Sequence, residues 1–330
     1  MRYGIVLLSL CLAVSCVLTA VSLRASGATD EARTLMNEGK RDQAKVLLLG
    51  EVERNPRDPE VDYLLSKVYV GEADFDLAAD YAEKAVKLAD SVSEYHLNYA
   101  RVLLAKTSQS GAAGAFLAAR KGKKEYERAI EVDPNNLEAR YELCLYLLVA
   151  PGLIGGDKEK AREQAAAISS KDEIFGSFAW ASVYEREQNT AKAESLFMRA
   201  VEIDTSSTAE ALYGLGYFYE RNQRYDEAIG IFKQIAGNRP DDLVAVFQLG
   251  RAYLDAKTDL EAAQAAFTRY LAEGPAPDGP DEAMTRWRLG QVYDLEGKRD
   301  SALVELRKAV ELAPKFKLYK TTLEEVEKKK

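Results

Sequence analysis

Histidine and cysteine are nearly absent from this 330-residue chain, which contains one histidine and three cysteines. The single histidine, His96, cannot supply a histidine cluster for zinc, and no motif typical of a catalytic serine accompanies it. Cys11 and Cys16 lie in an apolar N-terminal segment, which leaves Cys144 alone. We expect a packed thiol there and not a nucleophile. These absences predict a protein without a cofactor, without a metal site and without enzymatic activity.

The chain also lacks an excess of positive charge, because 53 aspartates and glutamates outnumber 45 lysines and arginines, for a net charge of −8. Binding of nucleic acid requires a basic face, so nucleic acid is not expected as a partner. One local basic cluster, residues 120–124, is expected to be a solvated helix face. The glycine-rich stretch at 152–158 lacks the spacing and the Gly-Lys-Ser/Thr ending of a phosphate-binding loop.

The long apolar run of the chain extends over residues 5–23 and follows a short basic start. This pattern, with small residues after it, is typical of a secretory signal. Cleavage is expected after Ser22 or after Ala28, so residues 1–28 are set apart from the rest of the chain. An exported protein of the periplasm or cell envelope follows from this reading.

Two alternatives for the same segment stay open. The run is nearly long enough to span a bilayer, so an uncleaved membrane anchor is the first alternative. The second is a lipoprotein anchored at Cys16, because residues 12–16 resemble a bacterial lipoprotein box, although Ala13 stands where leucine is favoured. All three readings place the remaining chain outside the cytoplasm or on a membrane, with membrane contact only through this segment.

A pattern of about 34 residues recurs along the rest of the chain. A Leu-Gly pair precedes a tyrosine, and an alanine and a large apolar residue follow after a polar turn. The clearest copies contain Leu215-Gly216 with Tyr219, Ala228 and Phe232; Leu249-Gly250 with Tyr253, Ala263 and Phe267; and Leu289-Gly290 with Tyr293, Ala302 and Leu306. Apolar residues at helical spacing on both sides of a polar turn predict a repeated helix–turn–helix hairpin.

These residues and offsets resemble the tetratricopeptide repeat, and about eight copies cover residues 29–316. The resemblance implies an all-α fold, a right-handed superhelical α-solenoid of stacked hairpins. A capping helix with a basic tail is expected at 317–330, where Leu318, Leu323 and Val326 would cover the last repeat. The closest approach of paired helices is expected at the small residues of one repeat position: Ala100, Cys144, Ala181, Gly216, Gly250 and Gly290.

Insertions interrupt the pattern near residues 107–115, 151–156 and 274–280. The second contains a proline and three glycines, which end the helix early. Leu153 and Ile154 are expected at the tip of that loop, where they would contact either a partner or the neighbouring repeat.

In proteins of this family the first helix of each pair lines a concave groove, and the fifth repeat position points into it. Here that position is mostly aromatic, and aromatic and arginine side chains are common in binding hot spots. The alternative is that these rings pack against neighbouring helices. The resulting groove candidates, with Tyr217 and Arg251 from the ninth position, are Tyr63, Tyr141, Phe178, Tyr213, Tyr217, Phe247, Arg251 and Trp287.

The predicted function is therefore that of a non-enzymatic protein–protein interaction scaffold of the cell envelope. It would bind an extended peptide or a helix in its concave groove. The alternative function is glycan binding in a polysaccharide export or assembly system, where aromatic rings would stack on sugar faces. Other proteins are the expected partners, and polysaccharide is the alternative partner.

Overall fold

The computed structural model describes residues 27–205, 209–276 and 279–329, and the described part is helical throughout, without strands. Residues 27–37 are helical and precede sixteen α-helices and one short 3₁₀ helix. In chain order these are α2 (Arg41–Arg54), α3 (Pro59–Gly71), α4 (Phe75–Leu88), α5 (Ser93–Thr107), α6 (Ala112–Val132), α7 (Leu137–Val149), η1 (Gly152–Ile154), α8 (Lys158–Ser169), α9 (Glu173–Arg186), α10 (Thr190–Ile203), α11 (Glu210–Arg221), α12 (Tyr225–Asn238), α13 (Leu243–Ala256), α14 (Leu260–Glu273), α15 (Glu282–Leu295), α16 (Arg299–Leu312) and α17 (Lys317–Lys328).

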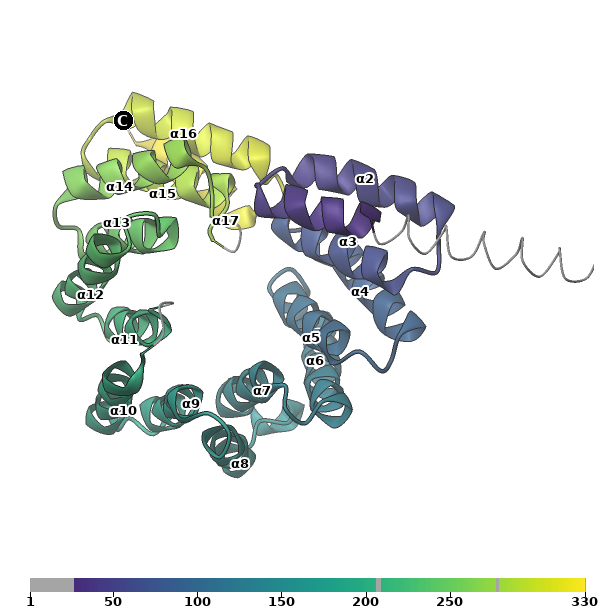
Figure 1. The fold of residues 1–330 in the computed structure, drawn as a ribbon. Helices are drawn as coiled ribbons and strands as arrows, with labels where there is room; N and C mark the ends of the chain where they lie inside the picture. The colour runs from purple at the N-terminus through teal and green to yellow at the C-terminus, as the bar shows by residue number, and fades with distance from the viewer. Residues whose placement is uncertain (1–26, 206–208, 277–278, 330) are drawn as a thin grey trace, which may run out of the picture.

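The hairpins stack side by side and curve until the array forms a ring (Figure 1). Helices α7, α9 and α11 face the inside of this ring, and α8, α10 and α12 form its outside. The ends of the array meet, because Arg41 of α2 pairs with Asp281 before α15, and Lys315 before α17 pairs with Asp74 before α4. The predicted all-α superhelical solenoid is confirmed, and it is more strongly curved than an open trough.

Most helices begin at an aspartate or asparagine that accepts a hydrogen bond from a backbone N–H in the first turn. This N-cap satisfies a donor that has no partner within the helix. Asp242, for example, accepts from the N–H of Ala245 at 3.2 Å and starts α13. The polar turns of the repeat pattern therefore position the helices as well as connecting them. The other side-chain N-caps in the described ranges are Asp58, Asp74, Asn136, Asp157, Asp172, Asn189, Asp259 and Asp281.

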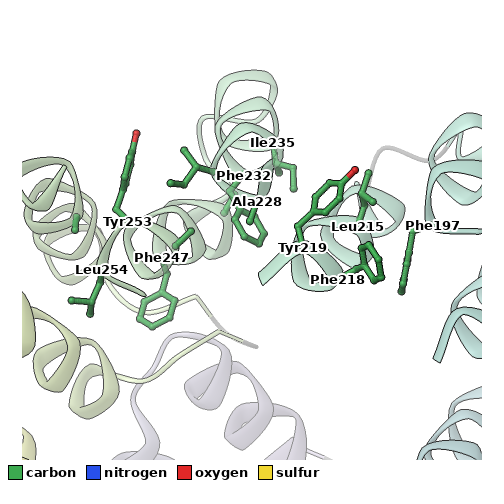
Figure 2. Packing of buried hydrophobic residues seen from close by; sticks show 14 of the residues in the cluster. Phe197, Leu215, Phe218, Tyr219, Ala228, Phe232, Ile235, Phe247, Tyr253 and Leu254 are labelled. Atoms are coloured by element: carbon green, nitrogen blue, oxygen red, sulfur yellow. The ribbon is translucent and has the colours of Figure 1, made fainter. Parts of the chain in front are cut away.

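The core lies between the paired helices and between successive hairpins, and small residues set the closest approaches. A Cβ added to Gly216 would lie 2.8 Å from the ring of Phe232, and one added to Gly250 would lie 3.0 Å from Ala266. The predicted repeat position of small residues is thus confirmed. Figure 2 shows the rings of Phe218 and Phe232 packed in the same apolar cluster. This cluster runs through several hairpins without a break, and it shares the partly buried Tyr141 and Tyr293 with the clusters on either side of it.

The insertions differ in what they become. The residues near 107–115 are only partly a connection, because α6 begins at Ala112 and extends to 21 residues. The expectation of extra residues between the helices was wrong for 112–115, where no helix-breaking residue other than Gly114 occurs and Gly111 precedes the helix. The residues at 274–280 lie between α14 and α15, and 277–278 fall outside the described residues.

The loop at 151–156 forms the 3₁₀ turn η1 and folds back over α6. A Cβ on Gly155 would meet the Lys123 side chain at 2.9 Å, and the Tyr146 hydroxyl donates to the Ile154 carbonyl at 2.7 Å. Ile154 is accordingly half-buried, whereas Leu153 is 82% exposed. Of the two loop candidates, Ile154 therefore contacts the neighbouring repeat, as one of the two expectations had it, and Leu153 does not.

The C-terminal helix α17 covers the last hairpin, as its predicted capping role requires. Val326 is buried and Leu323 packs against the same cluster, and Tyr319 supplies the largest buried side chain. The prediction for Leu318 was wrong, because this residue is 50% exposed. Within the basic tail, the side chain of Lys329 donates a hydrogen bond to Asp294 of α15 at 2.6 Å.

Candidate functional site

The rings at the fifth repeat position lie between hairpins and do not face the inside of the ring as free side chains. Phe247 is 1% exposed and Trp287 is 8% exposed, and Phe178 and Tyr63 are buried as well. Only Tyr141 and Tyr213 remain half-buried. The expectation of an exposed aromatic row was therefore wrong for four of these six residues, and the alternative of packing between helices holds for them.

Their contacts explain this burial. Phe247 lies 5.3 Å from the ring of Phe267 in the second helix of its own hairpin. Trp287 stacks on Tyr319 of α17 at 5.3 Å and donates through Nε1 to Thr322 Oγ1 at 2.9 Å. Each large ring thus fills the space between neighbouring helices, where its apolar area leaves water. The four buried rings offer no stacking platform for sugars, so they do not support the glycan-binding alternative.

The tyrosine hydroxyls connect successive hairpins. Tyr63 donates to Glu94 at 3.0 Å, and Tyr213 donates to Asp242 at 2.7 Å. Burial, followed by the adjacent carboxylate, raises the pKa of both phenols above their usual range. Tyr217 has a similar role, because its hydroxyl accepts from Gln248 of α13 at 3.0 Å. These groups fix the spacing of inner helices.

Arginines of the inner helices pair with carboxylates of a neighbouring inner helix. Arg251 of α13 pairs with Glu220 of α11, and its guanidinium lies 5.6 Å from the Tyr217 ring. An arginine held in this way has little capacity left for a partner's carboxylate. The other pairs of this kind are Arg101 with Glu138 and Glu142, Arg221 with Glu185, and Arg288 with Asp255.

A cavity of about 330 Å³ opens on the inner helices α3 and α5. Tyr63 lies in the lining, and Lys67 and Arg101, which occupy the ninth repeat position, supply positive charge. Lys67 is exposed and has no ion-pair partner in the described residues. The remaining lining residues are Val70, Glu94, Asn98, Val102 and Ala105.

A second cavity, of about 380 Å³, lies where α7, α9 and α11 follow one another. Its apolar side comes from α7 and includes Tyr141 and Val149, of which Val149 is 69% exposed. Its polar side comes from α9 and α11 and includes Arg186, an exposed residue for which the described ranges contain no ion-pair partner. The remaining lining residues are Leu145, Leu148, Ser182, Glu185 and Arg221.

The accessible inner surface is therefore built mainly from residues that are not among the sequence-based candidates, although Tyr217 and Arg251 were chosen from the same ninth repeat position. Lys67, Leu145 and Ser182 stand at the ninth repeat position, four residues after the buried fifth position. Residues four apart share a helix face, and the later one lies nearer the end of the helix, where the neighbouring hairpin no longer covers it. A search for exposed residue types at the ninth and thirteenth positions would have found them.

The remaining candidates for chemistry have packing roles. In the described ranges, no group of three or more histidine, cysteine, aspartate or glutamate side chains is close enough to hold a metal ion. Cys144 is fully buried and its Sγ donates to the Ala161 carbonyl at 3.3 Å. Burial raises the pKa of this thiol to about 12, so it is a packed thiol and a poor nucleophile. In the basic cluster of α6, Lys121 pairs with Glu83 and Lys123 with Glu127, so it is only partly a solvated face.

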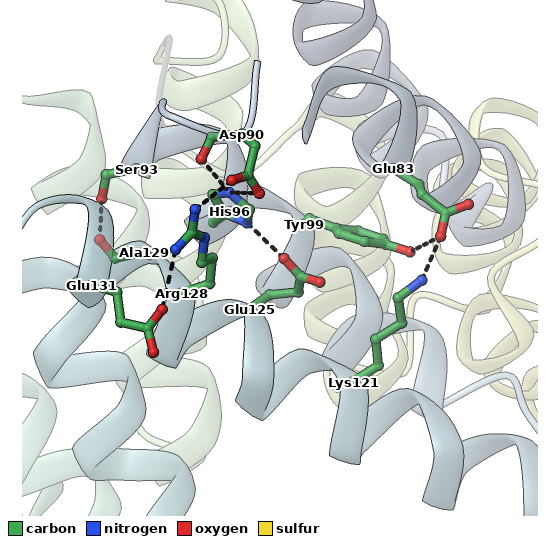
Figure 3. Close-up of polar contacts among 10 residues, drawn as sticks. All are labelled: Glu83, Asp90, Ser93, His96, Tyr99, Lys121, Glu125, Arg128, Ala129 and Glu131. Atoms are coloured by element: carbon green, nitrogen blue, oxygen red, sulfur yellow. Dashed lines mark hydrogen bonds and ion pairs between the residues drawn. The ribbon is translucent and has the colours of Figure 1, made fainter. Parts of the chain in front are cut away.

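His96 is 3% exposed and holds α5 against α6 and the turn before it (Figure 3). Its Nδ1 lies 2.7 Å from Glu125 Oε2, and its Nε2 lies 3.0 Å from the Asp90 carbonyl oxygen. Both neighbours are acceptors, so both ring nitrogens donate only when the imidazole is protonated, and these two contacts favour the positively charged form. The Asp90 carboxylate, which Arg128 also binds, lies 3.4 Å from Nε2.

The free energy of unfolding is expected to fall by about 1.5–3 kcal/mol as His96 loses its proton, the range for hydrogen bonds to charged groups. Burial lowers the pKa of His96, but the hydrogen bonds to Glu125 and Asp90 outweigh it and raise the pKa above its usual value. The stabilisation is therefore complete below the unfolded-state pKa of about 6.5 and is lost as pH rises through the folded-state pKa.

Urea denaturation over this pH range, with NMR titration of the imidazole, measures the effect. His96 is the only histidine, so a His96→Gln variant is a matched control without a titrating imidazole. If the free energy of unfolding depends on pH in the same way in the wild type and in the variant, His96 does not stabilise the fold through its charged form.

Models of the tetratricopeptide repeat match residues 63–125 and 178–242, and a further one matches residues 285–316. The chain belongs to the tetratricopeptide repeat family. This fold implies a protein–protein interaction scaffold, and tetratricopeptide repeat proteins are in general not enzymes. None of the helices in the described ranges has the length and apolar character of a membrane-spanning segment.

Similar solved structures include other tetratricopeptide repeat proteins. One from Parabacteroides merdae has 16% identity and a TM-score of 0.46, with 81% of this chain and 98% of that chain covered. A thermophilic protein from Thermus thermophilus has 17% identity and a TM-score of 0.46, with coverages of 70% and 99%. YrrB, described as having an unusual peptide-binding site, has 17% identity and a TM-score of 0.37, with coverages of 74% and 98%. No curated protein matches this chain.

Proposed function

We propose that the inner face of this tetratricopeptide repeat protein binds an extended segment of a partner protein, whose side chains enter the two cavities on the inner helices. The observation that supports this best is the cavity between α7, α9 and α11. It combines an apolar side with an exposed Arg186 on the polar side, which has no ion-pair partner among the residues that the structure describes. Apolar anchors supply most of the affinity in such a site, and the charge supplies orientation.

The cavity at α3 and α5 supports the same chemistry, because Lys67 adds a second cation that has no ion-pair partner within the described ranges. Both cavities lie on helices of the inner face, so one extended chain could occupy them in turn. The preferred segment would carry apolar side chains with acidic residues between them. Export to the cell envelope is a further part of the proposal and is based on the apolar residues 5–23 alone.

A Val149→Asp variant is expected to lose partner capture by tenfold or more while it keeps its helicity. Val149 is 69% exposed, so an aspartate there disturbs little packing, but it places a charge on the apolar side of the cavity. Capture is measured with a photo-crosslinking residue in place of Leu145, followed by mass spectrometry of the attached peptide. Affinity is then measured with the synthetic peptide.

The matched control is Val304→Asp on α16, because Val304 is 65% exposed and lines neither inner cavity. It should bind like the wild type. Equal loss in the two variants, or no loss in the Val149 variant, would rule out the inner cavity as the binding site.

A further inference from the structure

The two ends of the array meet through two ion pairs. In one pair the cation comes from the N-terminal end, and in the other it comes from the C-terminal end. In the first, Arg41 from the first described hairpin lies 3.7 Å from Asp281, which precedes α15. In the second, Lys315 from the C-terminal end pairs with Asp74, 241 residues earlier. Each end therefore gives one cation and receives one, which fixes the relative position of the two ends.

Each of the two carboxylates is also the N-cap of a helix. Asp74 caps α4 by accepting from the N–H of Leu77, and Asp281 caps α15 by accepting from the N–H of Met284. Arg41 is guided as well, because its side chain runs past Gly71 of α3, where a Cβ would lie 3.3 Å from Nη1. The contact is thus a defined pairing of fixed groups.

No apolar cluster of the described residues joins the two ends. The cluster of the first hairpins ends at Leu103, and the cluster of the last hairpins contains residues from Ala283 to Val326. Adjacent hairpins elsewhere share buried side chains, whereas the ends share two partly exposed ion pairs. Such pairs shift an equilibrium by roughly tenfold or less, and salt weakens them.

We propose that these two ion pairs form a salt-sensitive latch that holds the ring closed and controls access of a partner protein to the inner face. This regulation presupposes the inner-face binding proposed above. In the closed ring the helices that carry both cavities face inward (Figure 1). If a partner binds only the open array, its apparent affinity equals its affinity for the open form multiplied by the fraction of molecules that are open. Opening by salt, or by a charged partner that competes for Asp74 or Lys315, raises that fraction.

The test measures the distance between the ends in the full-length chain. Spin labels are attached at Val46→Cys on α2 and Val304→Cys on α16, both exposed. Cys11 and Cys16 are replaced by serine, and the buried Cys144 stays unlabelled. In the wild-type background the distance should be short at an ionic strength of about 0.1 M and longer at about 1 M, where the screening length falls to about 3 Å. Arg41→Glu with Lys315→Glu should be open at both.

The charge-matched control is Lys124→Glu with Lys160→Glu, two exposed lysines of α6 and α8 that have no ion-pair partner in the described ranges. It should stay closed at low salt. Asp74→Asn keeps a capping side chain and should relieve part of the opening caused by Lys315→Glu, because the like-charge contact is removed. A short distance in the Arg41/Lys315 variant at low salt would overturn the latch, as would a wild-type distance that does not respond to salt.

Access to the inner face is measured by the labelling of Val70→Cys, which lines the cavity at α3 and α5. A bulky polymer-linked maleimide should react severalfold faster, relative to a small maleimide, in the Arg41/Lys315 variant than in the wild type. An unchanged ratio would show that the ends do not control access. Neither readout uses a partner, so failure of the latch is distinguishable from failure of peptide capture, which the Val149 and Val304 variants test.

Discussion

Replacement of Trp287 by alanine is expected to lower the free energy of unfolding by about 3–5 kcal/mol, the range for truncation of a buried tryptophan. The ring stacks on Tyr319, its Nε1 donates to Thr322, and the Arg288 guanidinium lies 4.6 Å from it. Two of these three contacts reach α17, so the capping helix should detach first. Urea denaturation and the rate of tryptic cleavage within α17 measure the two effects.

Matched variants separate the ring from other causes. Trp287→Phe keeps one aromatic ring but loses the hydrogen bond to Thr322 and part of the buried ring area, so it should cost about 1–3 kcal/mol, less than the alanine variant. Leu318→Ala changes an exposed residue of the same capping helix and should stay within about 0.5 kcal/mol of the wild type. If Trp287→Ala unfolds and is cleaved like the wild type, the ring is not a structural anchor, and its role as a groove residue would be open again.

The repeat architecture could be predicted from the sequence because its period is carried by steric constraints. Gly216, Gly250 and Gly290 recur where the second helix of the hairpin lies too close for a larger side chain, with a Cβ at 2.7–3.0 Å from the facing atoms. Such a constraint leaves a small residue at the same offset in successive copies, and glycine in these three. The N-caps and the capping helix were predictable for a similar reason, because each is local to one turn of chain.

The direction of the aromatic rings could not be predicted in the same way. A large amphipathic ring is compatible both with an exposed groove and with a space between hairpins that has a carboxylate at its edge. Tyr213, which is half-buried and donates to Asp242, satisfies both descriptions. What decides between them is the angle between successive hairpins, and that angle is set by many small packing contacts and not by the residue itself.

Closure of the ring depends on the sum of these angles between successive hairpins. A small rotation for each hairpin, repeated along the array, decides whether Lys315 reaches Asp74 or remains distant from it. Neither residue has a sequence context that marks it as a long-range contact, because each stands in an ordinary polar turn. The same holds for Arg41 and Asp281. The charged surface at the two ends could therefore be recognised only once the array was placed in space.

Replacement of Gly176 by alanine is expected to cost about 3 kcal/mol, the upper end of the range for overpacking. Gly176 is buried near the start of α9, and a Cβ there would overlap the Cα and Oγ of Ser169, the last residue of α8. A Cα cannot rotate away as a side chain can, so the two helices must separate. This change should loosen the stacking of the hairpins on either side, and hydrogen exchange should quicken in α8 and α9 more than elsewhere.

Gly230→Ala is the matched control, because Gly230 lies within α12 and a Cβ there would meet nothing within 4 Å. Alanine in an exposed helix interior is favoured over glycine, so this variant should gain about 0.5–1 kcal/mol. The two substitutions are chemically identical and differ only in the space available, so opposite signs are expected from one urea denaturation series. A stabilised Gly176→Ala variant would mean that α8 and α9 are farther apart than described. The spacing of the inner helices that form the cavity at Val149 would then also be different from the one described.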